Sequence, residues 1–259
     1  MLDGLQLWLR ADRGVELVKG SSVVAWRDQS GNGHDAVQSD PYRCPRLIQS
    51  SIQGRPAIRF DGEDDVLGLV DAGGQEMTAL TVFVVHRLNR RGSKGSQSYT
   101  GDYFVMGLGG DGNVRYRYWG FATLGSAGGN SSDLVDVYSG WGNDMRMRKN
   151  GISTFGKTLL WCATTEGSIH RTKMYAEGTE CLGKPLGVDG PIRIKIGNAD
   201  GTGGGGLGGV LLDDLRVHAS ASEIAEVIVF NRVLQTAERA ATEKYLGQRY
   251  SLQISAPGR

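Results

Sequence analysis

The sequence has few cysteines and prolines, and it has no long apolar run. Its three cysteines, Cys44, Cys162 and Cys181, are an odd number and make a poor disulfide framework. A bridge between Cys162 and Cys181 stays open, although the turn signal at Glu166-Gly167 lies off-centre between them. No Cys-x-x-Cys pair occurs, which argues against a structural zinc site. No stretch of about 20 apolar residues occurs, so the sequence predicts no transmembrane helix.

The chain also lacks an excess of either charge. It has 29 basic and 28 acidic residues, for a net charge of +1. A nucleic-acid backbone is therefore not an expected partner. Short basic groups occur at 90–91, 115–117 and 146–149, and they fit either solvated strand faces or contact with an anionic glycan. No export signal precedes the first predicted strand, which leaves open a removed signal or a virion component.

Glycine is the residue in excess. The chain has 40 glycines in 259 residues, about twice the usual share of ~7%. These glycines show no three-residue period, which excludes collagen. With only 6 prolines, they are typical of tight turns and long irregular loops. All-β domains often reach roughly 200–250 residues, so we expect one domain over 1–259.

Alternation with a period of two indicates many strands. Apolar and polar side chains alternate at 5–9, 145–148 and 192–196, which predicts strands with one dry face. Residues 80–85 are apolar on both faces, so we place them at the centre of a sheet. Turn signals separate these strands at Asn32-Gly33, Asp61-Gly62, Asp111-Gly112, Asn150-Gly151, Asp189-Gly190 and Asp200-Gly201. The pattern predicts an all-β sandwich.

One helix is expected, at 234–246, packed on the outside of the sandwich. Four residues at helical spacing form its predicted buried face: Ala237, Ala240, Ala241 and Tyr245. Gln235 and Glu238 have the spacing of a capping box, but Gln is a poor N-cap, and Thr236 is the alternative.

Four sequence blocks, at 5–12, 26–35, 57–65 and 223–232, occur in an order that resembles one domain family. They are similar to LamG-like, concanavalin A-like jelly-roll domains of bacterial and phage surface proteins. The resemblance implies two antiparallel sheets with a short C-terminal helix. Residues 90–150 match poorly. Such sandwiches bind glycans, cleave glycans or build surfaces, and their loops decide which.

The resemblance also implies a structural calcium ion as an optional cofactor. Calcium takes six to eight oxygen ligands, mostly from carboxylates and carbonyls. The candidate ligands are Asp28, Asp35, Asp61, Asp64 and Asp65. Aspartates in turns also commonly accept hydrogen bonds from the local backbone, so both interpretations stay open.

Catalysis is not expected. Related glycosidases carry Glu-x-Asp-x-x-Glu, whose two glutamates act about 5–5.5 Å apart. The pair Glu223 and Glu226 lacks this spacing, and residues three apart in a regular strand point to opposite faces. A lyase would need a histidine and a tyrosine as acid and base, such as His86 with Tyr116 or Tyr118. Sequence gives no geometry for that pair.

A sugar would be bound by aromatic rings and planar polar groups, which are frequent in the poorly matched middle of the chain. Candidate ligand-binding residues are Tyr99, Tyr103, Arg115, Arg117, Trp119 and Trp141. Along 114–119, arginines and Trp119 alternate with Tyr116 and Tyr118. If the tyrosines lie in the core, Trp119 and the arginines are exposed.

The sequence therefore predicts a non-catalytic binding or adhesion module, for glycans, outside the cell or at its surface. The alternative is a phage virion structural or decoration protein that contacts other subunits. A glycan-cleaving hydrolase or lyase is the third hypothesis. Neither nucleic acid nor membrane insertion is expected.

Overall fold

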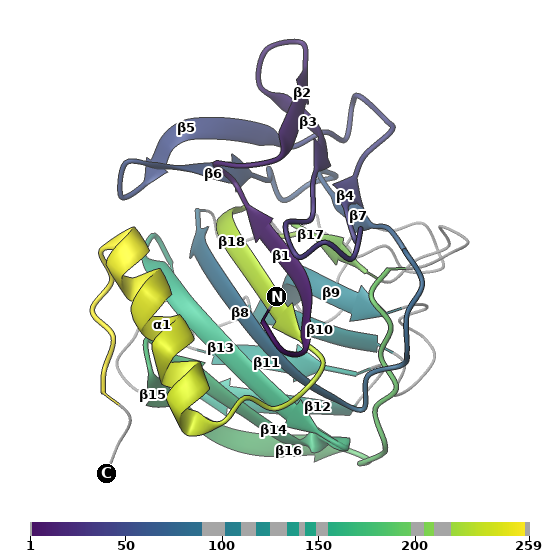
Figure 1. Ribbon diagram of the computed structural model, residues 1–259, viewed down its shortest axis with the longest axis vertical. Coiled ribbons are helices and arrows are strands. Elements are labelled where there is room, and N and C mark those ends of the chain that lie inside the picture. The colour runs from purple at the N-terminus through teal and green to yellow at the C-terminus, as the bar shows by residue number, and fades with distance from the viewer. Residues whose placement is uncertain are drawn as a thin grey trace.

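Two antiparallel sheets face each other in the computed structural model, which describes residues 2–89, 102–109, 118–124, 134–139, 143–148, 155–197, 205–209 and 219–256 (Figure 1). The first sheet contains β1 (Leu5–Arg10), β5 (Arg46–Ile52), β6 (Arg55–Arg59), β8 (Ala79–Leu88), β13 (Thr158–Glu166), β14 (Ser168–Ala176), β15 (Thr179–Glu180) and β18 (Ser222–Phe230). The second contains β4 (Ala36–Val37), β7 (Leu67–Leu69), β9 (Asp102–Gly109), β10 (Tyr118–Leu124), β11 (Leu134–Tyr138), β12 (Asn143–Arg148), β16 (Leu182–Gly187) and β17 (Gly206–Leu207). The expected all-β sandwich is confirmed.

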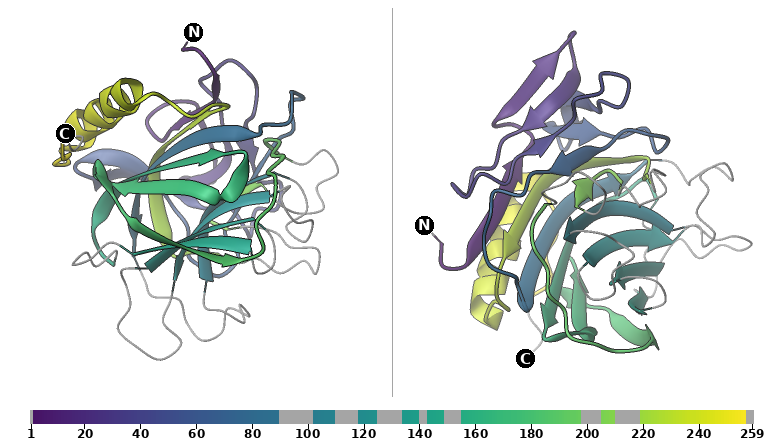
Figure 2. Two further views of the ribbon diagram at one scale, coloured as in Figure 1. Left: turned by 90° about the horizontal axis from the view of Figure 1, so that it is seen from below. Right: turned by 90° about the vertical axis from the view of Figure 1, so that its right-hand side faces the viewer.

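The hairpin of β2 (Val15–Val18) and β3 (Ser22–Trp26) extends from one end of the sandwich (Figure 2). β3 pairs with β4 and with β5, so it links the two sheets. The prediction of a single domain over 1–259 stays a prediction.

Strand β8 lies at the centre of the first sheet, between β13 and β18. Its residues from Leu80 to Val85 are buried on both faces, as the sequence predicts. The other edge of β18 pairs with β1 along most of its length and with β6 at its start. β18 is thus fixed by strands on both sides, which holds its side chains in place.

The main core lies between the sheets. It contains Leu7 and Leu9 of β1, Val84 of β8, Trp161 of β13 and Trp119 of β10, among others. Burying each such side chain contributes roughly 1.5–3 kcal/mol. A second apolar cluster, with Phe83 and Leu160 among its members, lies on the opposite, outer face of the first sheet.

Helix α1 (Thr236–Tyr250) covers this second cluster (Figure 1). Its position is as predicted, but the predicted buried face is wrong. Ala237 and Ala241 are exposed, whereas the buried residues are Arg239, Glu243, Leu246, Gly247 and Tyr250. No helix in the described part of the chain is long and apolar enough to cross a membrane.

An ion pair on the buried face of α1 explains why helical spacing of apolar residues does not predict this face. Arg239 donates to Glu243 at 2.6 Å, and the Arg239 guanidinium lies 3.7 Å from the centre of the Tyr175 ring. Two charged side chains therefore lie on the buried face, where apolar residues are expected. The N-cap is Gln235, not Thr236, and the backbone N–H of Gln235 donates to Glu238 Oε2 at 2.8 Å.

The segment at 192–196 is not a regular strand. Ile192, Ile194 and Ile196 are buried as the alternation predicts. Their backbone, however, makes only isolated bridges, such as the one between Met77 and Ile194. The alternation of apolar residues therefore predicts which side chains are buried, but it does not predict whether the backbone pairs as a regular strand.

All three cysteines are buried and free. Cys162 belongs to the cluster under α1, whereas Cys181 belongs to the core between the sheets. The two thiols thus lie on opposite faces of the first sheet, and the possible bridge between them does not form.

Candidate functional site

Three of the predicted calcium ligands converge in the turn after β6. Carboxylate oxygens of Asp61, Asp64 and Asp65 lie within 4.8 Å of one another. Asp61 Oδ1 also accepts the backbone N–H of Glu63 at 2.8 Å, and Asp65 Oδ2 accepts the N–H of Asp61 at 3.0 Å. Burial, followed by the charge of Asp61, raises the pKa of Asp65 to about 6. Asp61 and Asp65 thus accept hydrogen bonds from the backbone of their own turn. Calcium at this turn stays a prediction.

The other two predicted ligands, Asp28 and Asp35, organise a different loop. Asp28 accepts the N–H of Trp8 at 2.9 Å, the N–H of Ser30 at 2.8 Å and the N–H of His34 at 3.2 Å. Asp35 accepts the N–H of Asp28 at 2.8 Å and pairs with an arginine. These N–H donors occupy the lone pairs that a cation would need. Asp28 and Asp35 thus lie in a different loop from Asp61, Asp64 and Asp65, and calcium stays a prediction.

The predicted exposed aromatic face of β10 is also wrong. Trp119 is 1% exposed, and its Nε1 donates to Thr165 Oγ1 at 3.1 Å inside the core. Tyr118, on the opposite face of β10, is equally buried and meets Phe104 edge-on at 6.0 Å between ring centres. Both faces of this strand are thus covered, so Trp119 provides no sugar platform.

The remaining predicted ligand residues cannot be assigned contacts. Tyr103 has its backbone in β9, opposite Thr123 of β10. Tyr99, Arg115, Arg117 and Trp141 lie outside the described residues.

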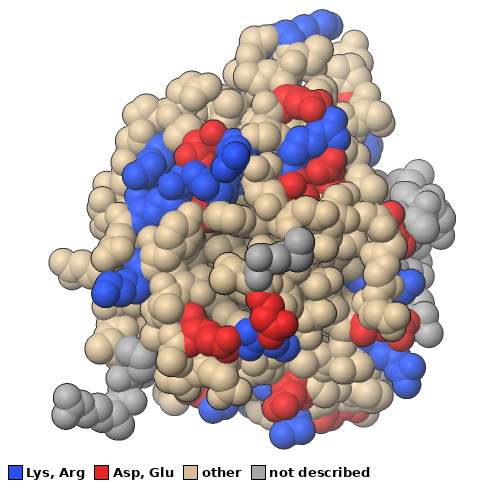
Figure 3. Space-filling model, in the orientation of Figure 1, with Lys and Arg blue, Asp and Glu red and all other residues tan. Residues whose placement is uncertain are grey.

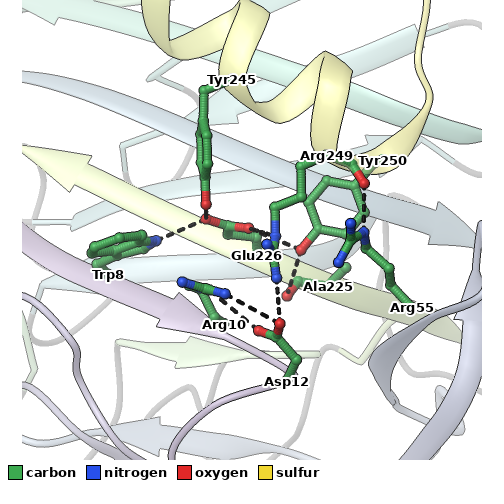
Figure 4. Close-up of polar contacts among 9 residues, drawn as sticks. All are labelled: Trp8, Arg10, Asp12, Arg55, Ala225, Glu226, Tyr245, Arg249 and Tyr250. Atoms are coloured by element: carbon green, nitrogen blue, oxygen red, sulfur yellow. Dashed lines mark hydrogen bonds and ion pairs between the residues drawn. The ribbon is translucent and has the colours of Figure 1, made fainter.

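A buried polar network lies under α1 and centres on Glu226 of β18 (Figure 4). Glu226 Oε1 accepts Trp8 Nε1 at 2.8 Å and the Tyr245 hydroxyl at 3.1 Å. Its Oε2 accepts the Tyr250 hydroxyl at 2.9 Å and lies 3.1 Å from Arg249 Nε. Three hydrogen-bond donors and one guanidinium, from β1 and α1, therefore converge on one carboxylate.

The network continues to the surface through Asp12. Arg249 also contacts Asp12, which accepts two further hydrogen bonds from Arg10, at 3.2 and 3.1 Å. Arg55 Nε donates to the Arg249 carbonyl at 2.5 Å, at the C-terminal end of the helix. Burial and the charge of Glu226 raise the pKa of Tyr250, and they raise that of Tyr245 to about 12. Both tyrosines are therefore neutral donors at physiological pH.

A β-bulge places Glu226 on this face. The register between β18 and β8 shifts between Ile224 and Glu226, so that Ala225 is the additional residue. A bulge reverses the alternation beyond it. Glu223 and Glu226 consequently lie on the same, outer face, and the prediction that they point to opposite faces is wrong. A charged residue within the otherwise apolar run 224–230 is the one sequence signal for this irregularity.

Glu223 has its own set of partners beside the end of α1. Its side chain is fully buried and forms ion pairs with Arg59, at 2.6 Å, and with Arg87. The Ser51 hydroxyl donates to Oε2 at 2.5 Å. Burial alone would raise the pKa of Glu223, but the hydrogen bonds from Ser51 and Arg59 and the charge of Arg87 lower it overall.

Neither glutamate is arranged for proton transfer. A general acid needs a raised pKa, and a nucleophile needs a free lone pair directed at substrate. Glu223 is held ionised, and both oxygens of Glu226 are occupied by donors. The ring of His86 is buried against Phe121, and burial lowers its pKa to about 3, so the imidazole is uncharged at neutral pH.

A pocket of about 920 Å³ lies along β14, between that strand and the start of α1. Arg171, Lys173 and Tyr175 line it from the outer face of β14, two residues apart, because the residues between them are buried in the sandwich. Glu180 of β15 adds a carboxylate 3.6 Å from Lys173. Sequence reasoning missed this pocket, although the alternation along 168–176 was its signal.

Comparisons with known proteins identify the fold. No protein-family model matches the chain, and no curated protein sequence matches it. A structure of Trypanosoma rangeli sialidase with the inhibitor DANA matches 96% of this chain with a TM-score of 0.54 and 14% identity. The chain spans 34% of the length of that sialidase.

Two further structures match nearly the whole chain. Domain 4 of AbnA, an extracellular arabinanase of family GH43 from Geobacillus stearothermophilus, was solved with arabinotriose. It matches 89% of this chain over 94% of its own length, with a TM-score of 0.50 and 12% identity. The binding domain of botulinum neurotoxin serotype G matches 93% of this chain over 51% of its own length, with a TM-score of 0.50 and 13% identity. These similarities establish a β-sandwich fold.

Proposed function

We propose that this protein is a non-catalytic, LamG-like glycan-binding module that acts outside the cell or at its surface. The observation that carries the proposal is the pocket along β14. Its volume of about 920 Å³ lies within the range of roughly 300–1,000 Å³ that is usual for small-molecule sites.

The lining of the pocket suits a sugar. Tyr175 is partly exposed and offers apolar ring surface for C–H groups, while Lys173, Glu180 and Arg171 offer charged hydrogen-bonding groups for hydroxyls. These side chains project from paired strands, so little conformational entropy is lost when a ligand binds. The presence of the same fold in a domain solved with arabinotriose is consistent with this role.

The proposal excludes catalysis by the two buried glutamates. Each is held by hydrogen bonds or ion pairs, and neither is among the residues that line the pocket. A hydrolase would need to release at least one of them towards the substrate.

The test is a glycan array probed with the full chain, followed by calorimetry of the best ligand with three variants. Arg171→Ala and Lys173→Ala should each weaken binding about tenfold, because each removes a hydrogen-bonding group at the pocket. Lys157→Ala, at an exposed lysine outside the pocket lining, is the matched control and should bind like the native protein.

The predicted residues between 99 and 141 provide the rival location. If Trp141→Ala abolishes binding while both pocket variants bind normally, the glycan lies at those residues and the pocket assignment fails. If the array shows no ligand at all, the glycan-binding function itself is contradicted.

A further inference from the structure

Four arginines lie together on the outer face of the first sheet, beside the C-terminal end of α1. Arg46 of β5 pairs directly with Arg59 of β6, Arg59 pairs with Glu223 of β18, and Glu223 pairs with Arg87 of β8. Directly opposed residues in antiparallel strands share a face. Arg55 precedes Arg59 by four residues in β6, an even number, and therefore lies on that face too. We call this set, Arg46, Arg55, Arg59 and Arg87, the arginine row.

The row carries a local excess of positive charge. Glu223 is the carboxylate that pairs with Arg59 and Arg87. Within the described part of the chain, no carboxylate lies within 4 Å of the guanidinium nitrogens of Arg46 or Arg55. Glu223 pairs with two of the four guanidinium groups, and Asp65 acts on Arg46 only from beyond ion-pair distance, so the row has a net positive charge.

The positive charge is accessible. Arg46 and Arg59 are exposed, and Arg55 and Arg87 are partly exposed. Figure 3 shows basic side chains gathered over β6 and the adjoining ends of β8 and β18, with acidic atoms between some of them. The neighbouring arginines 10 and 249 contribute no excess, because Asp12 and Glu226 neutralise them.

The side chains of the row are also held in place before any ligand arrives. The buried Glu223 orients Arg59 and Arg87 from below, and the Ser51 hydroxyl accepts from Arg87 at 2.9 Å. The helix-end carbonyl of Arg249 orients Arg55. Such preorganisation reduces the entropy lost on binding.

We propose that the arginine row binds an acidic polysaccharide through its carboxylate or sulfate groups. Guanidinium groups recognise planar and tetrahedral oxyanions by paired hydrogen bonds. The row crosses strands that are about 4.8 Å apart, on an open sheet face, so it fits a chain with repeated acidic groups better than one small anion. The inference takes from the proposed function only that the ligand is a glycan, and it uses a different surface.

The test uses the full chain and two probes, an oligogalacturonate for carboxylates and a heparin oligosaccharide for sulfates. Binding is measured by calorimetry at low and high salt. We expect at least one probe to bind and to weaken with salt, because exposed charges are screened. Arg46→Gln, at a side chain with no described polar contact, should weaken binding about fivefold, and Arg46→Gln with Arg55→Gln about tenfold or more.

The double variant Arg43→Gln with Arg193→Gln removes the same charge elsewhere and should bind like the native protein. Equal weakening in this control would overturn the inference, as would a native protein that binds neither probe. Equally tight binding of polyglutamate or a single-stranded DNA oligomer would also overturn it, because charge alone would then explain the affinity. Binding of the array ligand at the β14 pocket should be unchanged in all arginine variants, which separates this inference from the proposed function.

Discussion

At the scale of single residues, the outer face of the first sheet contains buried carboxylates that are held by specific partners. Removing a carboxylate from water is costly unless donors replace the water. Glu226 meets this requirement with Trp8, Tyr245, Tyr250 and Arg249. Its contacts join β1, β18 and α1, so its role is to fix the helix to the sheet.

Glu226→Gln should therefore lower the free energy of unfolding by about 3 kcal/mol, because Arg249 loses a buried partner. Urea denaturation measures this change. Glu16→Gln is the control, since Glu16 pairs with Arg27 at an exposed site and its loss should be too small to resolve. An unchanged stability for Glu226→Gln would mean that the carboxylate is not structural.

The raised pKa of Asp65 predicts how the stability of the protein depends on pH. Its pKa is raised from 3.8 to about 6, so the folded state holds a proton that the unfolded state has released between these values. Its contribution to stability is present below pH 3.8 and is lost as pH rises through about 6. The unfolding free energy of the native protein, relative to that of Asp65→Asn, should fall by about 2 kcal/mol over this window. Urea denaturation at a series of pH values measures it.

Calcium would reverse this behaviour. A bound cation favours the ionised carboxylate, so calcium at pH 7.5 should raise the melting temperature of the native protein but not that of Asp65→Asn. A melting temperature that does not respond to calcium would show the calcium prediction to be wrong.

At the scale of elements, local sequence rules identified the strands and the helix but not their irregularities. β1, β8 and α1 lie where alternation and helical spacing predict them. The bulge at Ala225 had a single sequence signal, the charged Glu226 in an apolar run, which does not fix the register between β18 and the distant strand β8. The buried face of α1 was not predictable, because the sheet beneath it supplies Tyr175 to cover Arg239.

The buried face of α1 can be tested by comparing a leucine-to-alanine substitution at a buried and at an exposed position. Leu246→Ala removes a buried side chain from the cluster under α1 and should cost about 3 kcal/mol of unfolding free energy. Leu182→Ala makes the same change at a side chain that is 71% exposed, and it should be nearly neutral. Chemical denaturation of both variants decides the point, and equal effects would contradict the assigned face.

At the scale of the whole molecule, the architecture was predictable because burial patterns and turn residues recur throughout the chain. The proposed ligand sites were not predictable, because they depend on which strands become neighbours. The β14 pocket and the arginine row each combine residues from separate strands, such as Lys173 with Glu180 and Arg59 with Arg87. The predicted aromatic Trp119 lies in the core for the same reason, since its neighbours cover it.

The most direct test is mass spectrometry of the oligosaccharides that the immobilised full chain retains from a defined mixture. The account predicts that specific oligosaccharides are retained and are recovered at their original length after prolonged incubation. Shortened oligosaccharides, or no retained oligosaccharide, would contradict it.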